Sequence, residues 1–348
     1  MTRVHFLVPD GLDLPTGGYG YDRRIIAELR EAGFLVEIVA VSRAFPCPGG
    51  ADLADAARRL AALPDGALVL ADGLAFGAMP EIAEREGARL NIVALCHHPL
   101  CLETGLSPEE SARLEDSERR ALAMARSVVV TAPATGREVA TRFGVAPEKL
   151  SVALPGTDPA PLSPGGGRPP LILSIGTLIP RKGHDILIAA LARLRALDWT
   201  CRIIGSGEAD PATAADLRQR IAEAGLGERV TMTGRSEDTR AALAKADIFA
   251  LASRYEGYGM VFAEAMSQGV PIVACAAGPI PDVVPASAGL LVPADDPQAF
   301  ADALERLITD EALRARLAAG AAEAGRALPS WRDAAAVFVA RLDEAARP

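Results

Sequence analysis

The chain has 348 residues, half of them hydrophobic and 23% charged, so it is long enough for two domains and is neither disordered nor fibrous. A net charge of −9 argues against a strongly basic, nucleic-acid-binding surface. The five cysteines are dispersed without a C-x-x-C pair, which argues against a disulfide framework or a zinc knuckle and favours a reducing compartment. The apolar run near the N-terminus is shorter than a signal peptide or a membrane-spanning helix requires. We therefore expect a cytoplasmic protein and leave peripheral contact with the inner face of a membrane open.

Short aliphatic runs alternate with stretches rich in Ala, Leu, Glu and Arg in the first part of the chain. The runs expected to be strands are Val4–Val8, Leu35–Val41, Ala67–Leu70, Leu90–Leu95 and Ser127–Val130. The stretches expected to be helices are Asp22–Ala32, Asp52–Leu63 and Pro108–Ala125. Because the strands are apolar throughout, they predict a parallel sheet with helices on both faces.

The segment Leu154–Pro170 interrupts this alternation with six prolines and four glycines, a composition that no packed helix or strand tolerates. We place a linker at 159–170, after a first domain at 1–158 and before a second at 171–328. The strands expected in the second domain are Leu171–Ile175, Cys201–Ile204, Val230–Thr233, Ile248–Leu251 and Pro271–Ala274. Its clearest helices are Gly183–Leu197 and Ala212–Ala224. A last helix, Trp331–Ala346 within 329–348, is expected to return to the first domain.

This order of elements predicts an α/β protein with two Rossmann-like, doubly wound domains facing a central cleft. In such sheets, ligands bind outside the carboxyl ends of the strands. Polar motifs at those ends are therefore the candidate functional residues.

The first motif is the glycine pair Gly17-Gly18, expected in a loop between the first strand and the first helix. Glycines let the backbone approach a ligand, and the N-terminus of a helix favours an anion. Contact with a phosphate and an ordinary tight turn both remain open here.

Two adjacent histidines, His97 and His98, follow the fourth expected strand. Neighbouring side chains on an extended chain point in opposite directions, so at most one of them is expected to face a ligand. No third ligand stands at a metal-binding spacing, which favours a polar contact with a sugar or a phosphate over a metal site. A hydrogen-bonded structural histidine is the alternative.

A basic pair, Arg181-Lys182, lies on the short loop after the first strand of the second domain. Lysine supplies a point charge and arginine a two-pronged one, and together they suit a diphosphate. A solvated basic pair on the surface is the alternative.

The strongest motif holds two carboxylates, Glu256 and Glu264, around a glycine turn and the start of a helix. The first backbone N–H groups of that helix, near Gly259, Met260 and Val261, would lie between them. This arrangement suits sugar hydroxyls, a phosphate and a ribose diol. Burial alone does not account for two acids in an otherwise apolar stretch.

The segment Glu256–Met266 has the form E-G-x-G-x-x-x-x-E-A-M and resembles the E-x7-E signature of family 4 retaining glycosyltransferases, such as glycogen synthases and phosphatidylinositol mannosyltransferases. The likeness extends over essentially the whole chain, through Gly176–Gly183, Gly205–Gly207, Gly269–Val273 and the Gly17-Gly18 pair. It implies the GT-B fold, with a nucleotide-sugar donor on the second domain and an acceptor on the first.

The resemblance also implies roles for single residues. Lys182 would contact the diphosphate, Glu264 the ribose and Glu256 the transferred sugar. The implied catalytic residues are His97, Lys182 and Glu256, with His98 as the alternative to His97. The implied donor-binding residues are Gly17, Gly18, Arg181, Lys182, Gly234, Arg235, Glu256, Gly259, Met260, Val261 and Glu264. Many members carry an arginine where this chain has Thr177, so the phosphate charge would rest on Lys182 and Arg181.

The implied reaction moves a hexose-type sugar, with retention of configuration, to a hydroxyl of a sugar or a lipid-linked acceptor in cell-envelope biosynthesis. It uses no cofactor and no metal, and the chain has no D-x-D triplet. A UDP-sugar is favoured over a GDP-sugar. A nucleotide-sugar epimerase or another GT-B enzyme, a two-carboxylate glycosidase and a non-catalytic binding protein are the alternatives. Arginines on helices of the first domain could face anionic lipid, but a solvated helix face is the favoured explanation.

Overall fold

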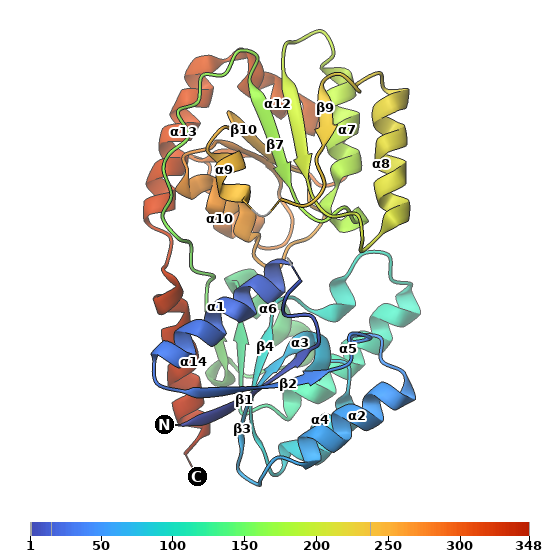
Figure 1. The fold of residues 1–348 in the computed structure, drawn as a ribbon, viewed down its shortest axis with the longest axis vertical. Coiled ribbons are helices and arrows are strands. Elements are labelled where there is room, and N and C mark those ends of the chain that lie inside the picture. Colours follow the sequence, from blue (N-terminus) through green and yellow to red (C-terminus); the bar gives the residue numbers. More distant parts are fainter. Residues whose placement is uncertain (1, 15, 237, 348) are drawn as a thin grey trace. The chain divides into compact units, whose positions relative to one another are not determined.

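The computed structural model describes residues 2–14, 16–236 and 238–347. Contacts within the chain divide it into two compact units (Figure 1). Unit 1 comprises Met1–Gly156 and Pro329–Pro348, and unit 2 comprises Thr157–Leu328. Each unit is built on its own parallel sheet.

The sheet of unit 1 has the order β2-β1-β3-β4-β5-β6. Its strands are β1 (Arg3–Pro9), β2 (Leu35–Val41), β3 (Leu68–Asp72), β4 (Asn91–Cys96), β5 (Ser127–Val130) and β6 (Leu150–Val152). Its helices are α1 (Gly17–Glu31), α2 (Gly50–Ala61), α3 (Gly73–Phe76), α4 (Pro80–Gly87), α5 (Pro108–Ala123), α6 (Pro133–Phe143) and α14 (Trp331–Ala345). The central strands are buried on both faces, as their unbroken apolar runs predict.

The glycine pair of unit 1 is the first turn of α1 and not a loop before it, which corrects the expected helix start at Asp22. The Thr16 hydroxyl accepts a hydrogen bond from the N–H of Tyr19 at 3.3 Å and so caps the helix. Glycine has a low helix propensity, and this is why the pattern alone hid the first turn.

The C-terminal helix α14 packs against α1 in unit 1 (Figure 1). The ring of Tyr21 meets the ring of Trp331 at a centroid distance of 5.7 Å and that of Phe338 at 6.1 Å. Tyr21 also donates a hydrogen bond from its hydroxyl to the carbonyl of Ala153. These contacts attach the last helix to the edge of the sheet where α1 begins.

The sheet of unit 2 has the order β12-β11-β10-β7-β8-β9. Its strands are β7 (Leu171–Ile175), β8 (Thr200–Ile204), β9 (Val230–Met232), β10 (Ile248–Leu251), β11 (Ile272–Cys275) and β12 (Gly289–Val292). Its helices are α7 (His184–Arg193), α8 (Pro211–Glu223), α9 (Thr239–Leu243), α10 (Met260–Ser267), α11 (Ile280–Val283), α12 (Pro297–Thr309) and α13 (Glu311–Arg326). The chain reverses its direction of strand addition between β7 and β10, which are hydrogen-bonded neighbours.

The proline-rich segment before β7 runs along unit 2. Ser163 bonds the carbonyls of Gln268 and Ala246, each at 2.8 Å. The N–H of Gly167 donates to Asp247 at 2.8 Å. The composition of this segment prevents it from forming a helix or a strand. Its polar groups therefore form hydrogen bonds with side chains and carbonyls elsewhere in unit 2.

Within the described residues, we find no helix that combines the length and the apolar character needed to cross a bilayer.

Candidate functional site

The predicted donor residues of unit 2 meet where its strand order reverses. The loop that carries Arg181 and Lys182 follows β7, and the loop that carries Glu256 follows β10. Adjacent parallel strands end at the same edge of a sheet, and in doubly wound sheets such a reversal opens a ligand-binding crevice. The topology thus brings together side chains that are 74 residues apart in sequence.

Lys182 and Glu256 form an ion pair at this edge. The Nζ atom of Lys182 lies 2.6 Å from Oε1 and 2.9 Å from Oε2 of Glu256. Ser253 donates its hydroxyl to Oε1 at 2.6 Å, and the Nη1 atom of Arg181 lies 3.6 Å from Oε2. Glu256 is only 4% exposed. Burial raises the pKa of Glu256, but the charges of Lys182 and Arg181 outweigh it, so the net pKa shift is downward and the carboxylate stays ionised.

A close backbone approach holds the two loops together. Gly183 has a φ of 64°, and a Cβ atom on it would stand 1.9 Å from the carbonyl oxygen of Ala252. Any larger residue would therefore force the loop after β7 away from the end of β10.

Arg254 connects the same two loops through its backbone and its side chain. Its N–H donates to the carbonyl of Arg181 at 2.8 Å, and its guanidinium donates to the carbonyl of Pro180. The guanidinium also binds Asp185 at 2.8 Å and Asp295 at 2.7 Å. Arg254 thereby holds the backbone just before Lys182 and the Asp185 side chain just after it.

Helix α10 begins beside Glu256 and contains the second acid of the motif. Gly259 precedes it with a φ of 88°, so Met260 and Val261 provide its first backbone amides. Those amides have no acceptor within the helix and are available to an anion. Burial raises the pKa of Glu264, one turn further along, and Arg240 only partly opposes this rise.

Other predicted donor residues of unit 2 lie outside the Lys182–Glu256 cluster. Gly234 follows β9 with a φ of 70°, and its carbonyl accepts a hydrogen bond from Gly205 at 2.9 Å. Arg235 next to it is exposed. Thr177 follows β7 at the edge of the sheet, where its carbonyl accepts a hydrogen bond from Ile179.

His97 of unit 1 follows β4 and contacts two fully buried aspartates. Its Nε2 atom lies 3.0 Å from Asp22 Oδ1 and 3.4 Å from Asp72 Oδ2. Burial lowers the pKa of His97, but the two carboxylates outweigh it and raise the pKa to about 10. Gly18 lies against the ring, since a Cβ atom there would stand 3.7 Å from its Cδ2 atom. His98 instead contacts Glu103 at 3.4 Å, so the two histidines serve different partners.

Among the described residues, Asp22, Asp72 and His97 form one group whose composition would also suit a metal ion. The hydrogen bond between His97 and Asp22 accounts for this grouping without an ion.

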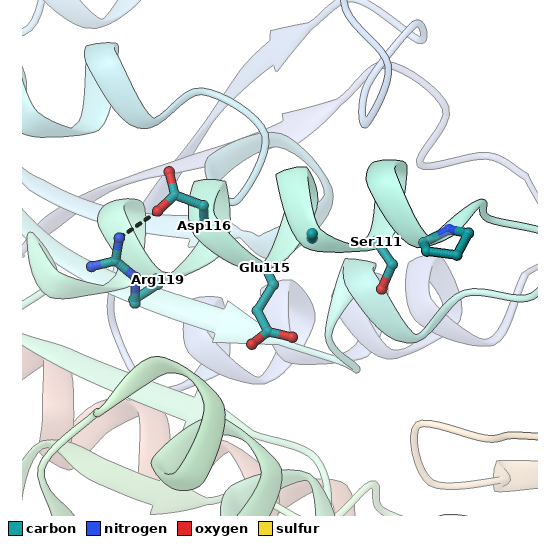
Figure 2. Close-up of a pocket in the computed structure, with 6 residues that line it drawn as sticks. Ser111, Glu115, Asp116 and Arg119 are labelled. Atoms are coloured by element: carbon teal, nitrogen blue, oxygen red, sulfur yellow. Dashed lines mark hydrogen bonds and ion pairs between the residues drawn. The ribbon is translucent and has the colours of Figure 1, made fainter.

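Figure 2 shows a hollow along α5 of unit 1, lined by Ser111, Glu115, Asp116 and Arg119, which contains none of the predicted site residues. Arg119 is paired with Asp116 there. Arg120 binds Glu81 and Glu84 on α4 at 2.9 and 2.8 Å. These arginines thus face carboxylates of their own surface, as a solvated helix face predicts.

Sequence reasoning assigned no role to Asp72, Ser253 or Arg254. Asp72 had one visible signal, because it is a charged residue that ends an apolar strand at the carboxyl edge. The partners of Arg254 depend on which strands are neighbours, and spacing along the chain contains no such information.

Comparison with known proteins gives residues 169–310 as a match to the family described as glycosyl transferases group 1. The D-inositol 3-phosphate glycosyltransferase of Jonesia denitrificans is 32% identical over 245 aligned positions, and the match covers 63% of this chain. The match spans 57% of that relative's length.

Solved structures resemble nearly the whole chain. Sucrose-phosphate synthase from Thermosynechococcus elongatus superposes with a TM-score of 0.83 at 20% identity and covers 99% of both chains. Anabaena HepE in complex with UDP-glucose gives 0.80 at 21% identity over 99% of this chain and 100% of its own. These likenesses show that the chain has the GT-B fold.

Proposed function

We propose, from the premise that residues 169–310 form a glycosyltransferase group 1 domain, that the protein transfers a hexose-type sugar from a nucleotide diphosphate sugar to a hydroxyl group. The observation that carries the proposal is the cluster of Lys182, Arg181 and Glu256 beside the first amides of α10. Cationic side chains and a helix N-terminus together suit a diphosphate.

The donor is a UDP-sugar in this proposal, because the similar HepE structure contains UDP-glucose. Lys182 and the amides of Met260 and Val261 bind the diphosphate. Glu264 accepts hydrogen bonds from the ribose hydroxyls. His97 in unit 1 donates a hydrogen bond to the transferred sugar.

The chemical step follows from where charge develops. As the bond between the anomeric carbon and the diphosphate breaks, negative charge grows on the leaving oxygen, and Lys182 stabilises it. The acceptor oxygen bonds to the anomeric carbon on the same face, and its proton passes to the leaving phosphate. This route retains the configuration without a protein nucleophile or a metal. Glu256 is bonded to Lys182 and Ser253, which suits it to positioning the sugar.

The acceptor is a hydroxyl on a sugar or on a lipid-linked precursor of the cell envelope. The name of the J. denitrificans relative, which specifies an inositol phosphate, supports a small polyhydroxylated acceptor. Contact with the inner face of a membrane belongs to the lipid-linked version of this proposal.

The test combines a thermal-shift panel of nucleotide-sugars with a transfer assay in which NMR follows the anomeric configuration of the product. We expect a UDP-sugar to stabilise the protein and its sugar to reach an acceptor with retention. Failure of every nucleotide-sugar to bind or react would reject the proposal. Product formation without an acceptor would indicate an epimerase instead.

Two variants locate the reaction at the proposed site. Lys182→Ala should lower turnover about 100- to 1,000-fold, because charge on the leaving group loses its main stabiliser. Glu264→Ala should weaken nucleotide-sugar binding about tenfold or more. The exposed residues Lys245 and Glu223, changed to alanine, are matched controls within unit 2 that should leave both quantities unchanged.

A further inference from the structure

The side chain of His97 lies between two carboxylates that are completely buried. Asp22 comes from α1 and Asp72 ends β3, the strand next to β4, which His97 follows. Both aspartates have 0% exposure, and both approach the same ring nitrogen, Nε2. A buried carboxylate without a compensating charge is costly, so the pair requires a cation.

The other groups that His97 contacts among the described residues are uncharged. The edge of Tyr21 meets the ring at 5.3 Å with an interplanar angle of 89°. The Thr131 hydroxyl donates to the backbone carbonyl of His97 at 3.1 Å. From α14, Trp331 and Phe338 hold Tyr21 in place. Tyr21 thus packs against the ring and Thr131 bonds the backbone of the same residue, and neither group adds a charge.

The charged and titratable neighbours come from α1, β3 and the end of β4, where burial, Glu118 and Asp72 raise the pKa of the Cys96 thiol and keep it neutral. Arg23 is the cation near Asp22, and its guanidinium is directed to the carbonyls of Leu12 and Leu14. Burial raises the pKa of Tyr19 to about 12, and Asp72 and Asp22 add to the rise, so this phenol stays neutral. Burial also raises the pKa of Asp22, to about 6, which leaves it ionised at neutral pH.

The hydrogen bonds of the two aspartates leave one oxygen of each carboxylate to be compensated by a cation. Asp72 accepts the N–H of Leu74 on Oδ1, and Asp22 contacts His97 through Oδ1. Within the described residues, the Oδ2 atoms of both are buried and accept no hydrogen bond. The imidazolium of His97 is the positive charge placed to compensate them.

We propose that Asp22 and Asp72 are positioning residues that keep His97 protonated at neutral and mildly alkaline pH. Nε2–H is then directed to the two carboxylates, and Nδ1–H remains as a hydrogen-bond donor for a ligand. His97 cannot accept a proton in this state. The part of the argument that concerns the sugar rests on the proposed glycosyltransferase reaction. There it excludes His97 as the group that takes the proton of the acceptor hydroxyl, because an imidazolium has no free lone pair, and this agrees with transfer of that proton to the leaving phosphate.

The test is a pH titration of the full-length protein labelled with 15N-histidine, followed by long-range 1H–15N correlation spectra. The chain has four histidines, and His97→Gln identifies the signals of His97. We expect imidazolium shifts for His97 beyond pH 8. Asp22→Asn and Asp72→Asn should each lower its pKa by about one to three units. Glu37→Gln, which removes a carboxylate 3.4 Å from His5, is the matched control and should leave the signals of His97 unchanged.

A pH profile gives a second readout that loss of folding would not imitate. The kcat/KM of the natural chain should be level between pH 6.5 and 8.5. That of Asp72→Asn should fall as the pH rises through the lowered pKa of His97 and recover in acid.

Three results would overturn the inference: neutral-imidazole shifts at pH 7.5 in the natural chain, an unchanged His97 pKa in both variants, or signals that move on addition of Zn²⁺ or Mg²⁺. The first of these results is measured on the natural chain, so it does not depend on whether a variant folds. The titration also needs no turnover, so an inactive protein with a protonated His97 would count against the proposed reaction alone.

Discussion

Lys182 and Glu256, which are both proposed to contact the donor, are paired with each other, with 2.6 Å between Nζ and Oε1. A diphosphate must therefore compete with the Glu256 carboxylate for one ammonium group. We predict that Glu256→Gln binds UDP about three- to tenfold more tightly, because a negative charge at the phosphate position is removed. Turnover of the UDP-sugar should fall about 100-fold, because the transferred sugar loses its positioning contact.

Isothermal titration with UDP and initial-rate measurements separate these two effects. Glu264→Gln is the comparison, since it should weaken UDP binding through the ribose. Equal weakening of UDP by both variants would show that Glu256 belongs to the nucleotide site and does not compete with it.

For single residues, the sequence identified the residue types but not their contacts. Glu256, Glu264 and Lys182 stand out because they are charged at the carboxyl ends of apolar strands or at a helix start. That Lys182 bonds Glu256 depends on β7 lying next to β10, which no local pattern encodes. The contacts of Asp22 and Asp72 with His97 likewise depend on which elements are neighbours in the sheet.

The loop between β7 and α7 is the element on which the proposed donor binding depends, and Arg254 contacts it from the loop after β10. Arg254 bonds the backbone of Pro180 and Arg181 and the side chain of Asp185 at the start of α7. We predict that Arg254→Ala lowers kcat about 10- to 100-fold with a smaller change in the KM for the donor, because Lys182 is less well oriented while its charge remains.

Steady-state kinetics with a varied UDP-sugar concentration measures this split. Arg220→Ala, which removes an exposed ion pair with Asp216 on α8, is the control and should retain full kcat. An unchanged kcat in Arg254→Ala would mean that the loop keeps its geometry through Gly183 and Ala252 alone.

Elements with strong patterns were predicted well, whereas among the short edge strands only β9 was predicted, as Val230–Thr233. The runs Leu35–Val41 and Ser127–Val130 coincide with β2 and β5. The edge strands β6 and β12 were missed, because they have only three and four residues and are partly exposed. A strand at the edge of a sheet needs neither a long apolar run nor burial on both faces, so composition does not distinguish it from a loop.

Over the whole molecule, two buried groups give the two units opposite responses to acid. In unit 1, burial raises the pKa of Asp22 to about 6 from 3.8, so the folded state takes up its proton first as the pH falls. In unit 2, burial lowers the pKa of His184 to about 4 from 6.5, so the unfolded state takes up its proton first. Acid therefore favours folding of unit 1 through Asp22 and opposes folding of unit 2 through His184.

We predict that unit 2 loses about 2 kcal/mol of stability between pH 7.5 and pH 5 through His184, because only the unfolded chain binds its proton over most of that range. The corresponding fall in the Tm of unit 2 is about 4–8 °C. Scanning calorimetry at the two pH values measures it, and His184→Gln should remove most of the fall while keeping a hydrogen-bond donor for the carbonyl of Gly176. His5→Gln, a change at the other end of the chain in unit 1, is the control that should preserve the fall. If the Tm of unit 2 in the natural chain were the same at pH 5 as at pH 7.5, His184 would bind its proton in the folded state.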